Sequence, residues 1–247
     1  MLSAHYSGKI NIADYWAVGD SRSVELSGYT RGTHSQNDQT LNLIIIGFNH
    51  DELETSINGI DKAAITVQTE TALTAKIEMI GASSVMNVDW STSDCRTALN
   101  AEYSSFYASL PSDIKNLIKS VNKITNIHDY HKSNSTANAY SGQTTTTDKI
   151  FLLSESETFG SNQSKNTPAD YGYIYSPLTD DGMQYEYMKS GSNRIKCDGS
   201  WYLRTAQISF GETEYYYGAD KTGSLVTTLS EYGAGRLRYY AVPAFCL

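Results

Sequence analysis

The chain has 247 residues, a formal net charge of −8 and no run of basic residues. Nucleic acids and anionic membranes bind stripes of Lys and Arg, so this charge argues against both as partners. A chain of this length can bury a large enough core to fold without a disulfide or a metal. Its three cysteines, Cys95, Cys197 and Cys246, lie far apart without zinc-type spacing. We therefore expect reduced thiols, no metal and no cofactor.

The beginning of the chain shows no export signal. Met1–Ile10 lacks the basic and apolar regions of a signal peptide, and the longest apolar run, Leu43–Phe48, is too short to span a bilayer. We expect a protein made in the cytoplasm that stays there or leaves as part of a particle, without membrane insertion. Residues 1–15 are predicted to be an N-terminal arm or attachment segment, followed by a single domain at 16–247.

Strand patterns recur from residue 21 onward. Ser21–Leu26 alternates polar and apolar residues, as a half-buried strand does. Tyr29–Thr40 and Asn126–Asp148 are rich in small polar residues and predict loops. Short apolar or alternating runs bounded by turn residues predict the other strands: Leu41–Phe48, Ala63–Thr69, Val121–Thr125, Lys149–Leu153, Trp201–Ala206 and a last strand that closes on Leu247.

Two short helices are predicted in the middle of the chain. The Ser-Thr-Ser run before Asp94 can cap a helix whose apolar residues recur three and four positions apart. A second helix opens at Leu110-Pro111-Ser112-Asp113, because Pro suits a first turn and Asp113 complements the positive helix end. Ser154–Glu157 has the spacing to cap a further helical turn. These elements predict one α+β domain, an antiparallel sheet with two short helices and long surface loops.

Tyrosine is the most unusual feature of the composition, with 19 Tyr against 6 Phe. Most of these tyrosines lie between Tyr171 and Tyr240. A buried phenol needs a partner for its hydroxyl, whereas in binding loops Tyr supplies a large contact area at low entropy cost. The pattern therefore fits a recognition surface, and it also fits a sheet whose exposed face is rich in Tyr and Thr.

A series of short motifs carries a family resemblance: Trp90-x5-Arg96-x2-Leu99-Asn100, Phe106-Tyr107, Leu110-Pro111, Val121-x-Lys123, Asp148–Ser154, Tyr185-Glu186-Tyr187, Trp201–Thr205 and Val242–Leu247. In this order they resemble the DUF6273 family of gut Firmicutes and their phages, over about Trp16 to Leu247. That family is similar to C-type-lectin-fold domains, among them formylglycine-generating enzymes and the variable proteins of diversity-generating retroelements. The resemblance implies a C-type-lectin-like fold whose long loops present a ligand-binding face.

The strand motif at 201–205 is expected to have mainly a structural role. Trp201 and Leu203 alternate inward, which leaves Tyr202 and Arg204 on the other face of the strand. We expect Arg204 to pair with a buried carboxylate or with loop carbonyls, and Trp90 to be a core anchor at the start of a helix. Family members usually have two tryptophans before Leu-Arg, where this chain has Trp201-Tyr202. A Gly-Val-Arg-Pro near the end is also replaced by residues that lack the arginine.

The resemblance implies a non-catalytic ligand- or receptor-binding module. Such a module would belong to a phage fibre or tail and contact a host-surface protein or glycan. The alternative is a structural virion protein whose Tyr-rich surface is a subunit interface, with other virion proteins or further copies in a trimer as partners. The expected location is the virion, with the bacterial cytoplasm or cell surface as the alternative.

The expected contact surface lies in the Tyr-rich segments 171–187 and 211–240. Aromatic and guanidinium groups dominate the energy of interfaces. Three adjacent tyrosines cannot all point inward from one strand, so at least one of the run at 215–217 should be exposed. The predicted ligand-binding residues are Tyr202, Tyr215, Tyr216, Tyr217, Tyr232, Arg236, Arg238 and Tyr239.

No catalytic set stands out in the sequence. Cys197 and Cys246 are the only candidates for the cysteines that formylglycine-generating relatives use with copper. His128 and His131 have a spacing that suits a metal, but their flanks predict a solvated loop. The acidic residues at 51–54 predict a solvated turn, and the calcium-binding tripeptides of sugar-binding lectins are absent.

Overall fold

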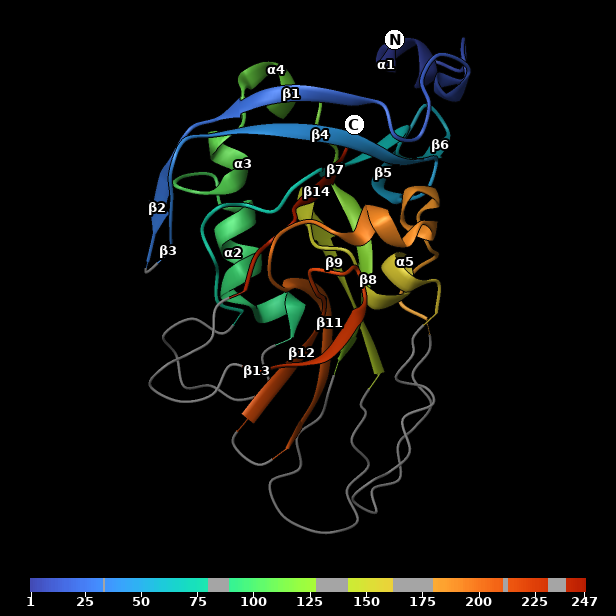
Figure 1. Cartoon of the computed structure of the whole chain (residues 1–247). Helices are drawn as coiled ribbons and strands as arrows, with labels where there is room; N and C mark the ends of the chain where they lie inside the picture. The colour runs from blue at the N-terminus through green and yellow to red at the C-terminus, as the bar shows by residue number, and fades with distance from the viewer. Residues whose placement is uncertain (33, 80–88, 128–141, 162–179, 211–212, 231–238) are drawn as a thin grey trace.

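The computed structural model describes residues 1–32, 34–79, 89–127, 142–161, 180–210, 213–230 and 239–247. It is a mixed α+β structure with mostly antiparallel sheets and few helices, as the sequence predicts. Both termini lie at one end of the molecule, and a three-stranded sheet lies at the opposite end (Figure 1).

A five-stranded antiparallel sheet forms the middle of the fold. Its strands, in spatial order, are β1 (Ser21–Leu26), β4 (Gln39–Phe48), β7 (Ile65–Thr69), β14 (Ala244–Cys246) and β10 (Ile150–Phe151). The strand at the C-terminus therefore lies between strands from the two halves of the chain. The branched apolar run predicted as a central strand is β4, which pairs with β1 on one side and β7 on the other.

Three smaller sheets complete the strand structure. Seven residue pairs join β8 to β9, so the loop predicted at 126–148 is wrong at both ends. Residues 126–127 belong to β8, and in β9 β-branched Thr side chains favour a strand. Tyr29–Thr40, also predicted as a loop, contains the hairpin of β2 and β3. The strands, sheet by sheet, are β6 (Ile60–Lys62), β5 (Glu52–Ile57), β8 (Val121–Ile127) and β9 (Gly142–Asp148); β11 (Trp201–Phe210), β12 (Thr213–Ala219) and β13 (Leu225–Ser230); β2 (Tyr29–Arg31) and β3 (His34–Gln36).

The helices are short, and a Ser side chain caps α2, α3 and α5. The first predicted helix is α2 (Asp94–Asn100), and its N-cap Ser93 accepts a hydrogen bond from the backbone of Arg96. The second is the single turn α4, and an unexpected turn, α3, precedes it with Ser105 as its cap. Among the described residues, none of the helices has the length and apolar character needed to cross a bilayer. The other bounds are α1 (Leu2–His5), η1 (Ile12–Asp14), η2 (Trp90–Thr92), α3 (Phe106–Ser109), α4 (Ser112–Lys115), α5 (Glu155–Phe159), η4 (Glu186–Lys189) and η5 (Gly191–Arg194).

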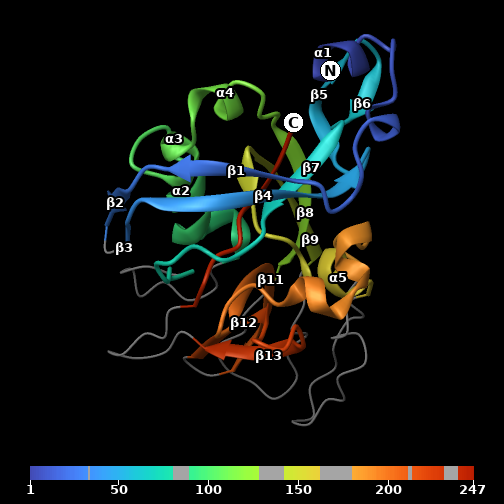
Figure 2. The same cartoon turned by 45° about the horizontal axis from the view of Figure 1, so that its top comes forward.

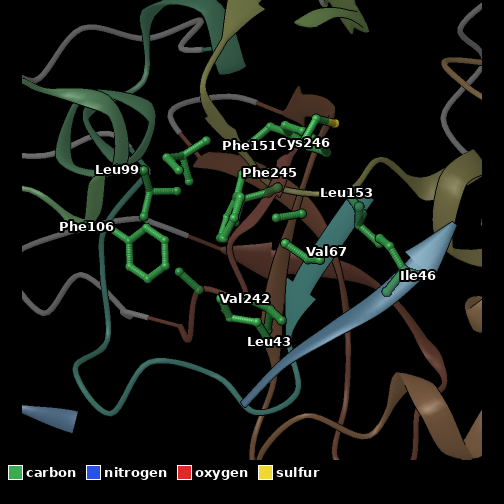
Figure 3. Close-up of a cluster of buried hydrophobic side chains, with 14 of the residues drawn as sticks. Leu43, Ile46, Val67, Leu99, Phe106, Phe151, Leu153, Val242, Phe245 and Cys246 are labelled. Atoms are coloured by element: carbon green, nitrogen blue, oxygen red, sulfur yellow. The ribbon is translucent and has the colours of Figure 1, made fainter. Parts of the chain in front are cut away.

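The two faces of the five-stranded sheet bury different chemistry. Successive side chains of a strand point to opposite faces, so Val67 and its cross-strand partner Phe245 share one face. Figure 3 shows Phe245 among buried apolar side chains that include Leu99 and Phe106. The neighbouring Cys246 points to the other face, where polar groups are buried.

The first 15 residues, expected to form an arm, pack against the domain. The Tyr6 hydroxyl donates to the Leu247 carbonyl at 2.8 Å and accepts from the Ala64 amide at 2.9 Å. Asn58 donates to the Tyr6 carbonyl at 2.9 Å, and Ile12 is fully buried. Figure 2 shows α1 beside β5 and β6. These contacts join the beginning and the end of the chain at one end of the fold.

Candidate functional site

Four charged side chains from different elements meet in the interior. They are Asp51, just before β5; Lys123 in β8; Glu157 in α5; and Arg204 in β11. None of the four is more than 3% exposed. We call these four residues the buried charge cluster. Two anions and two cations balance its formal charge, which is the condition under which charges are tolerated in a protein interior.

Glu157 reaches the cluster because of the way α5 begins. It is the third helical residue after Ser154, and the two form a capping box: each side chain bonds the other's backbone amide, at 3.0 and 3.1 Å. Both carboxylate oxygens of Glu157 also accept from Arg204, and one accepts from Lys123. Burial alone would raise the pKa of Glu157, but the charges of Arg204 and Lys123 hold it below its ordinary value.

Arg204 ties together the segments that surround it. Besides its ion pair with Glu157, the guanidinium donates to the carbonyls of Leu152, Ile124 and Asp181, at 2.9, 3.0 and 3.0 Å. Burial would lower the pKa of Arg204, but the Glu157 carboxylate keeps it above its ordinary value. The expectation that Arg204 pairs with a buried carboxylate and with carbonyls is confirmed.

The other half of the cluster is built around Asp51. Its carboxylate accepts from Lys123 and, at 2.8 and 2.9 Å, from the Tyr185 hydroxyl. The Thr66 hydroxyl and the Cys246 thiol of the five-stranded sheet also donate to it. Burial alone would raise the pKa of Asp51, yet Lys123 brings it well below its ordinary value. The acidic turn predicted to be solvated at 51–54 is therefore wrong for Asp51, because these donors replace its hydration.

The cluster joins three parts of the chain that are far apart in the sequence: β8, Asp181 and β11. Arg204 bonds the backbone of β8, which precedes residues 128–141, and of Asp181, which follows residues 162–179. Arg204 itself lies in β11, which precedes residues 211–212. A buried set of paired charges with these bonds fixes the relative positions of the strands and of α5. The arrangement is a structural clamp.

Three of the predicted ligand-binding tyrosines are buried. Tyr202, Tyr216 and Tyr217 are 0%, 1% and 3% exposed, so their rings form part of the core and not of a contact surface. The Tyr202 ring lies edge-on to Tyr216, with centroids 5.9 Å apart, and edge-on to Tyr239 at 5.2 Å. Aromatic pairs favour this edge-on geometry.

The other predicted contacts are placed only in part. Tyr239 is half-buried against the tyrosines of the core. Tyr232, Arg236, Arg238 and the side chain of Tyr215 lie outside the described residues, so their role stays a prediction. In the other Tyr-rich segment, residues 171–179 also lie outside the description, and Tyr185 is fully buried in contact with Asp51.

The strand at 201–204 is covered on both faces. Trp201, Tyr202, Leu203 and Arg204 are all fully buried, so neither face of the strand is exposed to solvent there. The covering on the Arg204 side comes from β8 and α5, which the sequence does not place beside β11. Trp90 is confirmed as a core anchor: it is fully buried and its indole donates to Asp148 at 2.9 Å.

Sequence reasoning missed Asp51, Lys123 and Glu157 as partners. One available signal was Lys123, which shares a strand face with Val121 and Thr125 and so places a charge on an apolar face. The Ser154 capping box was the signal for Glu157. Each of these two signals concerns a single residue and does not indicate which residue it pairs with.

The cysteines and histidines were the candidates for metal-dependent chemistry in the sequence. None of the three cysteines forms a disulfide; Cys95 and Cys246 are buried and Cys197 is half-buried. His128 and His131 lie outside the described residues. Within those residues, no group of three or more His, Cys, Asp or Glu side chains is arranged to hold a metal ion.

Comparisons with known proteins identify a family. A family model described as "Domain of unknown function (DUF6273)" matches residues 67–247. The match begins later than the resemblance expected from Trp16 onward, and it includes the last three residues of β7, all of β14 and three members of the buried charge cluster. Searches of the curated proteins and of the solved structures gave no significant match. The chain belongs to the DUF6273 family.

Proposed function

We propose that this protein is a non-catalytic ligand- or receptor-binding module with a C-type-lectin-like fold. It contacts a host-surface protein or glycan through the end of the molecule that carries β11–β13, as part of a phage fibre or tail. The sequence resemblance supports the fold and the setting, and the arrangement of the chain supports the position of the contact surface.

The observation that carries this proposal is the separation of the two ends of the molecule. Tyr6 and Leu247 are hydrogen-bonded to each other at one end, and β11–β13 lie at the other (Figure 1). A module joined to a larger assembly through its termini would direct β11–β13 away from that assembly. The buried charge cluster lies between, and it secures β11 to β8 and α5.

The buried tyrosines have a supporting role in this proposal. Tyr202 of β11 packs edge-on against Tyr216 of β12 and against Tyr239. Contact with a ligand is assigned to the residues that follow β13, a segment that contains Tyr, Arg and Gly. The predicted contacts there are Tyr232, Arg236 and Arg238. Rigid support for a binding surface reduces the entropy cost of binding.

Cell attachment tests the proposal. The fluorescently labelled chain is incubated with a panel of gut Firmicutes, beside the triple variant Tyr232→Ala, Arg236→Ala, Arg238→Ala. We expect the amount of triple variant bound to cells to be lower by about tenfold or more, because these residue types carry most interface energy. Its melting temperature should be unchanged. The control is Tyr15→Ala, an exposed tyrosine near the N-terminus, which should attach normally.

Sedimentation of both proteins separates recognition from assembly. If the wild-type chain is a trimer that the triple variant dissociates, the surface is a subunit interface and the structural virion protein is the better interpretation. Attachment of the triple variant at the wild-type level would contradict the proposed contact surface.

A further inference from the structure

A groove of about 840 Å³ lies away from the buried charge cluster. It is formed by the end of β1 and the start of β2 on one side, and by the connections from α2 to α4 on the other. Figure 1 shows α3 and β2 on one flank of the molecule, apart from β11–β13. The volume lies within the range of sites that bind small molecules.

An exposed tyrosine stands at this groove. Tyr103 is 82% exposed, although it lies between the buried Leu99 and Phe106 in the sequence. Arg31 donates to its carbonyl at 3.2 Å, which fixes the backbone from the opposite side of the groove. Ser104 has a left-handed backbone with a φ of 50°, an unfavourable state for a residue other than Gly. The chain is thus bent at the point where the Tyr103 ring enters solvent.

The remaining lining is polar and includes two carboxylates. Glu25 accepts from the Thr40 hydroxyl at 2.9 and 3.0 Å, which orients it, and each carboxylate oxygen can accept further hydrogen bonds. Glu102 forms an ion pair with Lys149 at 3.0 Å, so one of the two acidic charges is already balanced. The hydroxyls of Ser27, Thr30 and Ser104 also line the groove.

We propose that this groove binds a neutral saccharide. A pyranose ring presents C–H groups on one face, which pack against an aromatic ring, and hydroxyl groups at its edge. Tyr103 supplies the ring, and Glu25 accepts from the sugar hydroxyls. The carboxylates disfavour an anionic ligand. The pairing of Glu102 with Lys149 leaves too little net charge to favour a cationic peptide over a sugar. This site shares no residue with the proposed contact surface after β13, so each can fail without the other.

Titration calorimetry with maltoheptaose, mannohexaose and the hexamer of N-acetylglucosamine tests the proposal. We expect at least one oligosaccharide to bind the wild-type chain, and Tyr103→Ala to weaken that binding about tenfold or more. Tyr103→Phe keeps the ring and should bind as the wild type does. Glu25→Gln keeps the shape of an acceptor without its charge and should weaken binding less than Tyr103→Ala.

Several results would overturn it. One is the absence of binding by all three oligosaccharides at millimolar concentration; another is equal affinity of the wild type and Tyr103→Ala. Binding of hexalysine that Glu25→Gln abolishes, without saccharide binding, would assign the groove to a cationic peptide instead. Tyr15→Ala removes a tyrosine that is 54% exposed elsewhere and serves as the matched control. Circular dichroism of each variant checks that the fold is retained.

Discussion

The two faces of the five-stranded sheet are made by neighbouring residues of the same strands. In β14, Phe245 points to the apolar face that Leu99 and Phe106 cover, and the next residue, Cys246, donates to Asp51 on the opposite face. Both faces are buried from solvent at this point, since Phe245 and Cys246 are each fully buried. The difference lies in what replaces water: dispersion contacts on the first face, and directed hydrogen bonds and ion pairs on the second.

This difference predicts different tolerance to substitution. An apolar face gains its energy from volume and area, so a side chain of similar size restores most of it. A charge cluster gains its energy from pairing, so the loss of one member leaves another charge buried without a partner. Three experiments test this contrast.

The largest effect is expected for Arg204→Met, which keeps much of the side-chain volume and removes the guanidinium. It leaves Lys123 as the remaining cationic partner of Glu157 and removes the Arg204 donor from three backbone carbonyls. We expect the free energy of unfolding to fall by about 3–5 kcal/mol, measured by urea unfolding. Arg22→Met, at an exposed ion pair with Asp113, is the matched control and should leave the urea midpoint nearly unchanged.

The double variant Arg204→Met, Glu157→Leu sharpens this test. Replacing both partners by apolar groups should recover part of the lost stability, because no Glu157 carboxylate then remains without its arginine. If Arg204→Met lowers the free energy of unfolding no more than Leu99→Met on the apolar face does, the buried charge cluster is not a structural clamp.

The second-largest effect is expected from acid, which should reduce the contribution of the buried charge cluster to stability. The folded-state pKa of Asp51 and of Glu157 lies below the ordinary 3.8 and 4.5, so both groups bind fewer protons folded than unfolded. Their contribution to the free energy of unfolding is complete above these ordinary pKa values. It is lost as the pH falls through them toward the folded-state pKa. Urea unfolding at a series of pH values should show that the free energy of unfolding begins to decline near pH 4.5 as the pH is lowered.

Asp51→Asn is the control for this pH dependence. The variant cannot titrate at position 51, so its stability should fall less steeply with acid than that of the wild type. An identical slope in the two proteins would show that Asp51 has no depressed pKa in the folded state.

The smallest effect is expected on the apolar face. Leu99→Met replaces a fully buried residue of α2 by one of similar volume. The free energy of unfolding should fall by less than about 1.5 kcal/mol, because volume-conserving apolar changes are well tolerated. Urea unfolding under the same conditions as for Arg204→Met gives the direct comparison, and a larger loss for Leu99→Met would reverse the contrast.

Local patterns predicted most of the fold elements. Ser21–Leu26 is β1 with the predicted bounds, and the helix expected after the Ser-Thr-Ser run is α2. The errors lie where local composition was polar, as in the Thr-rich strand β9, since its seven pairs with β8 depend on a partner elsewhere in the chain. Of the candidate site, Arg204 was predicted with its kind of partner, and Tyr202, Tyr216 and Tyr217 were assigned to the surface although they are buried.

The sequence by itself determined the alternation of side chains along each strand, the helix caps and the family motifs, because these depend on residues close together in the chain. Only the tertiary structure decided which charges and which tyrosines are buried. Asp51 and Lys123 are 72 positions apart, and Glu157 and Arg204 are 47 apart. Whether a charge is solvated or clamped depends on partners that only folding brings within hydrogen-bond distance.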